Sequence, residues 1–260
     1  MRSTASRLWP ALAPALLLAG LLGLWELAAQ TGLLADVFGI EDFLVPAPSD
    51  IGQALWEDRS LLADDAWVTL KEVVLGFGLA VVCGVGFAAL IHLSDTARRA
   101  VYPLLVASQT IPIVILAPIL VVVFGFEIQT KLAIVALICF FPITVNTLDG
   151  LRSVDPELLK LMRTLGAGRV QTLRRVEGPW ALPYAFSGAK VAVAVSVIGA
   201  VFAEAAGSNA GLGHLIDQAN AQLLTARSFA AMVVLSAMAI ALFALLALLE
   251  RRVVSWRVER

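Results

Sequence analysis

Long apolar runs separated by short polar segments dominate this chain. Crossing a bilayer core of roughly 30 Å takes about 20 helical residues. Six runs have a suitable length, at residues 8–29, 68–92, 101–123, 130–148, 182–205 and 229–249. The pattern predicts six transmembrane helices, and an even number of spans leaves both chain ends on one side of the membrane.

The composition agrees with this pattern. Hydrophobic residues make up 60% of the chain and charged residues 15%, and the mean hydropathy is +0.88. Soluble domains carry about a quarter charged residues. We therefore expect an all-α integral membrane protein with one domain. Its predicted parts are an N-terminal transmembrane helix (1–30), an extracytoplasmic segment (31–67), a transmembrane core (68–250) and a cytoplasmic tail (251–260).

The basic residues predict the orientation, because Lys and Arg near span ends gather on the cytoplasmic side. Fourteen lie on the side of the chain ends, against four on or near the other side. Both termini are therefore expected in the cytoplasm. The fourteen are Arg2, Arg7, Arg98, Arg99, Arg152, Lys160, Arg163, Arg169, Arg174, Arg175, Arg251, Arg252, Arg257 and Arg260, and the four are Arg59, Lys71, Lys131 and Arg227.

The first apolar run allows a second interpretation. Arg2 and Arg7 precede a stretch rich in Leu and Ala, which is also the pattern of a cleaved signal peptide. Its length of about 22 residues favours a retained span. Cleavage would instead leave the mature N-terminus outside.

The longest charged interruption in the second half, residues 149–181, predicts two short cytoplasmic helices. Asp155 before Pro156 is a helix-start signal, and Gly166-Ala167-Gly168 permits a left-handed stop. A second helix is expected from about Arg169 to Val176, ended by Gly178-Pro179. The first helix has an apolar face of Leu158, Leu161, Met162 and Leu165, with Lys160 and Arg163 opposite.

These residues carry a resemblance. Gly166, followed after nine residues by Val176-Glu177-Gly178-Pro179, is similar to the cytoplasmic loop of permease subunits of binding-protein-dependent ABC importers. In that loop a Glu-Ala-Ala triplet, a glycine and an Ile-x-Leu-Pro ending recur; here Lys160-Leu161-Met162 replaces the triplet and Gly178 the leucine. The likeness extends from Phe43–Ser49 through Gly207–Gly213 to the last apolar run. The chain resembles the nitrate, sulfonate and taurine group.

The resemblance implies a homodimer of permeases, two cytoplasmic ATP-binding subunits and an extracytoplasmic solute-binding protein in a prokaryotic inner membrane. ATP and Mg²⁺ would bind to the partner ATPase, and this chain would hold no cofactor, metal or catalytic residue and bind no nucleic acid. The residues expected to couple to the ATPase are Glu157, Lys160, Leu161, Met162, Arg163, Gly166, Ala167, Arg169, Val176 and Pro179.

The sequence lacks the motifs of several other functions. The glycines of Gly207–Gly213 do not form a P-loop, because none of the four lysines follows a glycine. No serine-elbow, His-Glu-x-x-His or Cys-x-x-Cys motif occurs, and His92 and His214 are expected at opposite interfaces. An intramembrane enzyme is therefore disfavoured. A channel stays open as an alternative, although it has no evident need for the two-helix loop.

Polar residues near helix breaks predict the translocation pathway. Ser108-Gln109-Thr110 precedes Pro112 in the third span, Asn146 follows Pro142 in the fourth, and Glu204 lies towards the outer end of the fifth. Irregular backbone and charged groups at membrane depth usually line protein or water. The alternatives are that the hydroxyls bond to their own helix and that Glu204 is a paired structural acid.

The predicted substrate rests mainly on resemblance. Residues 107–112 and 139–150 look most like permeases for pyrimidine precursors of thiamine. Gln109 and Glu204, without a strongly buried arginine, suit a neutral or weakly basic heterocycle. Alkanesulfonates, taurine, nitrate and riboflavin stay open as substrates.

Two further patterns each allow two interpretations. The acidic residues Glu57, Asp58, Asp64 and Asp65 suggest a docking surface for the binding protein, or simply an interfacial region beside a short amphipathic helix. Gly76, Ala80, Gly84 and Ala88 recur every four residues and permit close helix packing, either within this chain or against a second copy.

Overall fold

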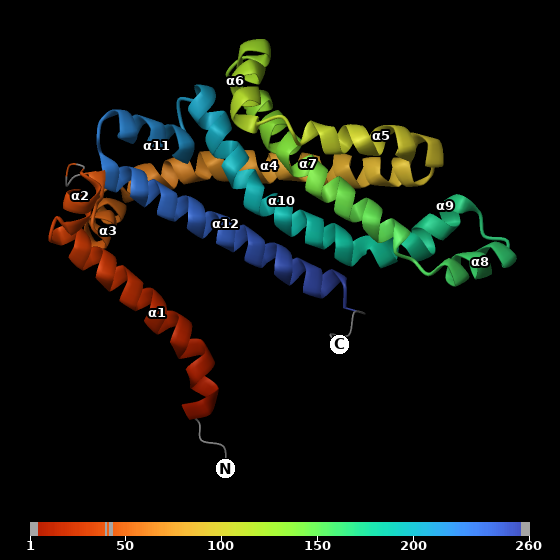
Figure 1. Cartoon of the computed structure of the whole chain (residues 1–260). Helices are drawn as coiled ribbons and strands as arrows, with labels where there is room; N and C mark the ends of the chain where they lie inside the picture. The colour runs from red at the N-terminus through yellow and green to blue at the C-terminus, as the bar shows by residue number, and fades with distance from the viewer. Residues whose placement is uncertain (1–4, 40, 42–43, 256–260) are drawn as a thin grey trace. The chain divides into compact units, whose positions relative to one another are not determined.

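The computed structural model describes residues 5–39, 41 and 44–255, and its regular elements are all helical (Figure 1). Arg2, Phe43, Arg257 and Arg260 lie outside the described residues. The α-helices are α1 (Ala5–Gln30), α2 (Leu33–Phe38), α3 (Pro48–Glu57), α4 (Arg59–His92), α5 (Asp95–Ser108), α6 (Ile113–Phe124), α7 (Ile128–Arg152), α8 (Pro156–Thr164), α9 (Arg169–Thr172), α10 (Gly178–Gly207), α11 (Leu212–Ala221) and α12 (Thr225–Val253).

Most predicted spans correspond to long apolar helices. By length and composition, α4, α7, α12 and the helix Arg169–Gly207 can each cross a membrane. The pair α5 and α6 makes a fifth span if it is one broken helix, bent by 97° at the predicted break (Figure 1). The first predicted span coincides with α1, of which Leu16–Gln30 counts as a shorter apolar helix. The all-α membrane fold is confirmed, and the sixth span stays a prediction.

The residues group into two compact units. One comprises Met1–Asp64 with Leu215–Val234, and the other comprises Asp65–His214 with Leu235–Arg260. In the first unit, the Glu26 carboxylate of α1 accepts bonds from the backbone N–H (2.9 Å) and hydroxyl (2.6 Å) of Ser49 in α3. These two bonds link α1 to α3 within the first unit.

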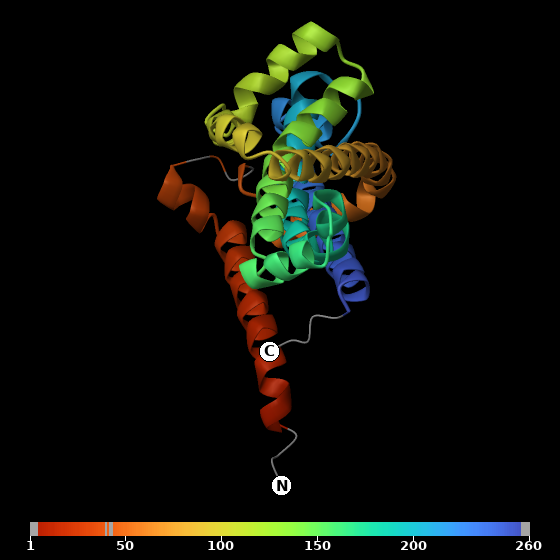
Figure 2. The same cartoon turned by 90° about the vertical axis from the view of Figure 1, so that its right-hand side faces the viewer.

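Small residues let the helices of the second unit pack closely. A Cβ added at Gly76 of α4 would lie 2.7 Å from Val135 Cβ of α7, and one at Gly84 would lie 3.0 Å from Ile143 Cγ2. A Cβ at Gly188 of α10 would come 2.5 Å from the Pro142 carbonyl oxygen of α7. The small-residue face of α4 therefore packs within this chain. Figure 2 shows α4, α7 and α10 from the end where α8 and α9 lie.

One sequence prediction is wrong: Gly178-Pro179 does not end the second short helix. A π-helical turn, Leu173–Glu177, joins α9 to α10, so that one helix of 39 residues runs from Arg169 to Gly207. The Gly178 N–H donates to the Leu173 carbonyl, five residues earlier. Proline breaks a regular α-helix because it lacks an N–H and its ring clashes with the carbonyl four residues back. The wider π turn accommodates Pro179, and the helix continues.

Candidate functional site

The α8–α9 loop (residues 153–177) is shaped by local signals that the sequence displays. The Asp155 carboxylate caps α8 by accepting from the Glu157 N–H at 2.8 Å, and Pro156 occupies the first helical position. At the other end, the N–H groups of Gly166 and Ala167 bond to carbonyls of the last turn at 3.0 Å each, and Gly166 has φ +75°. This is a Schellman ending, which favours glycine at the left-handed position. The predicted first helix is confirmed.

The surface of α8 is open within the described chain. None of the α8 residues is buried. Leu161, Leu165 and Val170 are 53%, 71% and 60% exposed and form what we call the apolar strip. Exposed apolar patches on amphipathic helices are typical of sites where another protein binds. The predicted residues Glu157, Lys160, Arg163, Gly166 and Arg169 are exposed around the strip, and Met162 and Ala167 are half-buried.

A buried contact between Glu177 and His92 fixes the base of this loop. Glu177 is 8% exposed, and its Oε1 lies 3.1 Å from His92 Nε2 at the end of α4. The Trp180 Nε1–H donates to the Ser153 hydroxyl at 3.1 Å, which links α10 to the end of α7. Sequence reasoning missed the pair because its partners are far apart along the chain. Val176 and Pro179, predicted to couple, are half-buried at this base.

The predicted pathway residues of α5 and α6 lie at the bend between the two helices. The Ser108 hydroxyl donates to the Leu105 carbonyl and the Thr110 hydroxyl to the Ala107 carbonyl, both at 2.7 Å. These bonds match the interpretation in which hydroxyls bond to their own helix. Gln109, which ends α5, is exposed, and its amide has no hydrogen-bond partner among the described residues. Pro112 is also exposed and precedes α6.

The side chain of Asn146 is likewise engaged within its own helix. Its Nδ2 donates to the Pro142 carbonyl at 2.7 Å, and the residue is half-buried in α7. This is a bond from a side chain to the carbonyl four residues earlier in the same helix. Of the predicted pathway amides, only that of Gln109 lacks a bond within the described chain.

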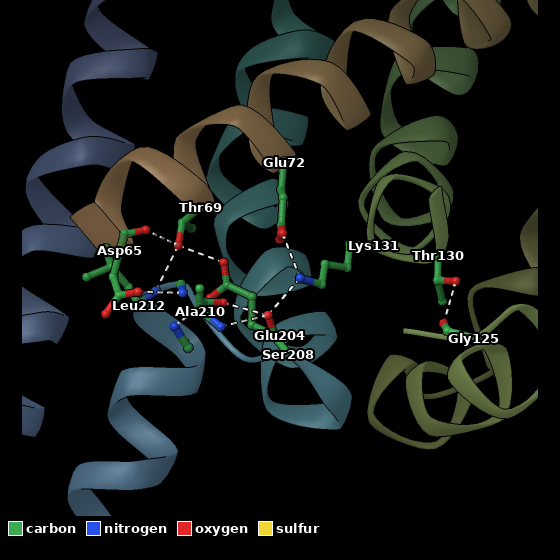
Figure 3. A network of polar contacts seen from close by, with 12 residues as sticks. Asp65, Thr69, Glu72, Gly125, Thr130, Lys131, Glu204, Ser208, Ala210 and Leu212 are labelled. Carbon is green, nitrogen blue, oxygen red and sulfur yellow. Dashed lines mark hydrogen bonds and ion pairs between the residues drawn. The ribbon is translucent and has the colours of Figure 1, made fainter. Parts of the chain in front are cut away.

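Glu204 belongs to a buried polar network (Figure 3). Glu204 is fully buried. Its two carboxylate oxygens accept hydrogen bonds from the Thr69 hydroxyl (2.7 Å) and the Gly213 N–H (2.6 Å). Thr69 also accepts from the Leu212 N–H at 2.9 Å, and Asp65 accepts from the Gly211 N–H at 2.7 Å. The network joins α4 to the loop 208–213, so Glu204 can contact a solute only if these bonds break.

A buried lysine carries the positive charge of the same region. Lys131 Nζ of α7 lies 3.0 Å from Glu72 Oε1 and donates to the Ser208 hydroxyl at 2.7 Å. The side chains of Lys131 and Glu72 are 12% and 2% exposed. Figure 3 shows Glu72 and Lys131 pointing towards each other beside Glu204. Buried charges are costly unless they are paired, and Lys131 pairs here with Glu72.

The predicted outer acidic group is partly engaged in the fold. Asp65 is in the network, while Asp58 forms a two-point pair with Arg227, with N···O distances of 2.7 and 2.9 Å. Glu57 accepts from the Gln53 amide at 2.7 Å, whereas Asp64 is exposed. Three of the four acids therefore have structural partners within the chain.

Comparison with known proteins identifies the family. The model of the family described as "Binding-protein-dependent transport system inner membrane component" matches residues 77–255. The chain belongs to this family. The predicted family is confirmed, and the matched residues include the α8–α9 loop and Glu204. The basic and apolar residues of the α8–α9 loop of this permease lie on the exposed surface described above.

Relatives of this permease span nearly its whole length. It is 37% identical over 252 residues to the formylaminopyrimidine transport permease protein ThiX of Halalkalibacterium halodurans, covering 96% of this chain and 98% of ThiX. It is 34% identical over 250 residues to the riboflavin transport system permease protein RibX of Chloroflexus aurantiacus, covering 95% and 91%. Both proteins are permeases of transport systems, as predicted for this chain.

A solved structure shows the same fold. A chain of the MetNI methionine ABC transporter superimposes with a TM-score of 0.65 at 20% identity, covering 78% of this permease and 99% of that chain. At this identity the likeness concerns the fold alone. The all-helical arrangement is thus that of an ABC transporter membrane subunit, and the permease function follows from the family.

Proposed function

We propose that this permease imports a pyrimidine precursor of thiamine. The observation that carries the proposal is the 37% identity to ThiX across 96% of this chain and 98% of that protein. Similarity over the whole length includes the spans that would form the pathway. The sequence of the third and fourth predicted spans, residues 107–112 and 139–150, supports the same assignment.

The proposed assembly contains two copies of this permease, two cytoplasmic ATPase subunits and an extracytoplasmic binding protein. ATP and Mg²⁺ bind to the ATPases, and this chain supplies no catalytic residue. Both termini and the α8–α9 loop lie in the cytoplasm, which the excess of basic residues on that side supports. The chain thereby couples hydrolysis in its partners to movement of the solute.

Coupling takes place through the α8–α9 loop. The apolar strip, Leu161, Leu165 and Val170, would enter a groove on the ATPase, because no part of the described chain buries it. Lys160, Arg163 and Arg169 would form a charged rim around it. When the ATPases close on ATP, the two loops of the dimer move together, and the attached spans change from inward-facing to outward-facing.

The proposed pathway follows the bend between α5 and α6. Its residues are Ser108, Gln109, Thr110 and Pro112, with Asn146 and Glu204 from neighbouring helices. Gln109 is the strongest candidate for solute contact, since its exposed amide has no bond within the described chain and can donate to and accept from a heterocycle. Glu204 would contribute by positioning the loop 208–213 through the hydrogen bond that it accepts from the Gly213 N–H.

Uptake of labelled solutes tests the proposal. Cells expressing the permease with its genomic neighbours should accumulate a labelled aminopyrimidine precursor but not taurine, and Gly166→Asp should abolish uptake and ATPase association. Gly166 has φ +75°, and a Cβ there meets nothing within 4 Å, so the substitution reports on a partner surface. Gly39→Asp is the matched control, because Gly39 has φ +64° and equally empty surroundings.

The outcomes separate substrate from coupling. Taurine uptake alone would refute the pyrimidine assignment and keep the importer. Unchanged uptake and association in Gly166→Asp would remove the coupling role from the α8–α9 loop. Equal losses in Gly39→Asp and Gly166→Asp would attribute the effect to backbone strain instead of docking.

Riboflavin is the second candidate substrate. The 34% identity to RibX over 95% of this chain favours riboflavin over alkanesulfonates, taurine and nitrate. Including labelled riboflavin in the same uptake experiment distinguishes the two vitamins, because each assignment requires accumulation of its own solute and no competition by the other.

A further inference from the structure

A cavity lies where the α8–α9 loop meets the turn between α4 and α5. Its volume is about 250 Å³, far more than the roughly 10–15 Å³ that one water requires. Arg98 contributes to it from α5, Arg163 from α8 and Arg169 from α9. Side chains from three helices that are separate in sequence thus converge on one space.

The cavity has an excess of positive charge. Three guanidinium groups, which stay charged in proteins, face one carboxylate, Glu177, and that carboxylate already lies 3.1 Å from His92. Neither Arg163 nor Arg169 forms an ion pair with another described residue. Arginine binds phosphate through two parallel hydrogen bonds, so a phosphate group is the ligand that this set of donors suits best.

The depth of the cavity in the membrane indicates where the phosphate comes from. Trp180 follows Glu177 by three residues, a rise of about 4.5 Å along a helix, and is 50% exposed. Tryptophan gathers at the level of lipid headgroups. The cavity therefore lies beside the headgroup layer, where lipid phosphates are concentrated, and basic pockets between helices on the cytoplasmic side bind anionic headgroups.

We propose that this cavity is a binding site for the phosphate of an anionic phospholipid. The bound headgroup joins the α4–α5 turn to the α8–α9 loop and steadies the surface on which the ATPase docks. This site is separate from the solute pathway, so the proposal holds whichever solute the permease transports. An acidic side chain of the ATPase is the alternative ligand for the same donors, and measuring ATPase association distinguishes it from a lipid.

Lipid binding can be measured on the full-length chain in nanodiscs. We expect native mass spectrometry to find phosphatidylglycerol retained in preference to phosphatidylcholine. Arg98→Gln should weaken this retention about fivefold, because it removes one of the three guanidinium groups that line the cavity. Arg99→Gln is the matched control, because Arg99 neighbours it on α5 but does not line the cavity; it should change retention less than twofold.

Further variants protect the test against misfolding. Arg169→Gln removes a donor from the opposite wall and should also weaken phosphatidylglycerol retention about fivefold. Arg98→Lys keeps the charge and should restore most of the retention. Arg98→Gln and Arg169→Gln change the same cavity from two different helices, so a loss of retention common to both is not explained by damage to one helix.

Four results would overturn the lipid assignment. Equal retention of phosphatidylglycerol and phosphatidylcholine, or equal losses in Arg98→Gln and Arg99→Gln, would reduce the effect to general surface charge. Thermal stabilisation by millimolar inorganic phosphate in phosphatidylcholine nanodiscs, lost in Arg98→Gln, would keep a phosphate site but assign it to the free ion. Lipid retention unchanged in Arg98→Gln, with weaker ATPase association, would assign the cavity to a partner's acidic side chain.

Discussion

Replacing Lys131 with methionine should strongly destabilise the permease. Lys131 is the cation of the buried network, 3.0 Å from Glu72 and 2.7 Å from the Ser208 hydroxyl. Without it, the Glu72 carboxylate, whose Oε2 already lacks a hydrogen-bond partner in the described chain, is buried without a counter-charge. Removing one partner of a buried ion pair costs about 3–5 kcal/mol. The lost serine bond adds about 1 kcal/mol.

This loss should be visible in a melting experiment in detergent, followed by the fraction of monodisperse protein. For a chain of this size, 1 kcal/mol corresponds to roughly 2–4 °C, so a loss of about 4–6 kcal/mol should lower the melting temperature of Lys131→Met by about 8–24 °C. Lys71→Met is the control. Lys71 is exposed and lies 5.9 Å from the Trp67 ring, a contact that contributes about 0.5–1 kcal/mol.

A double substitution checks the cause. If burial of an uncompensated charge is responsible, Lys131→Met with Glu72→Met should recover most of the lost melting temperature, since buried pairs can often be replaced by apolar residues at little cost. A melting temperature of Lys131→Met equal to that of Lys71→Met would refute the reasoning. So would a double variant that melts below the single variant.

Single contacts give three more predictions. Gly211→Ala should cost about 3 kcal/mol or more of stability, because Gly211 has φ +109° and the new Cβ would meet the Glu204 carboxylate. The control Gly125→Ala, with φ +83° and open surroundings, should cost about 1 kcal/mol. Equal melting temperatures of the two variants would contradict this prediction. Arg227→Lys should lower the free energy of unfolding by about 1 kcal/mol, because it loses the two-point bond to Asp58. The control is the same substitution in an Asp58→Asn background, where it should have no effect. Leu165→Ser should leave the melting temperature unchanged but reduce co-purification of the ATPase at least tenfold; a lower melting temperature would mean that the side chain packs within the chain.

Features governed by local chemistry could be predicted from the sequence. The start of α8 at Asp155-Pro156 and its end at Gly166 follow from capping signals within a few residues. The break at Ser108–Pro112 follows from proline geometry. The long apolar runs identified the spans for the same reason, since hydropathy is a property of the segment itself.

Features that depend on distant partners could not be predicted in this way. The pairing of His92 with Glu177 and of Lys131 with Glu72 depends on how α4 packs against α7 and α10. Hydropathy identifies Glu204 as unusual in its span, but its bonds to Thr69 and Gly213 require three-dimensional contact. The continuation of the helix through Pro179 was missed because proline is expected to end a helix of regular α geometry. The wider π turn before it removes that restriction.

The π turn has a mechanical consequence for this permease. It merges the end of the α8–α9 loop and a membrane span into one rod, and the 27 residues from Glu177 to Glu204 span about 40 Å at the usual helical rise. A twist applied at the loop end of such a rod turns its far end as well, with no hinge required where the loop joins the span. Rotation of the loop at Glu177 would therefore be transmitted along one continuous helix to the polar network around Glu204.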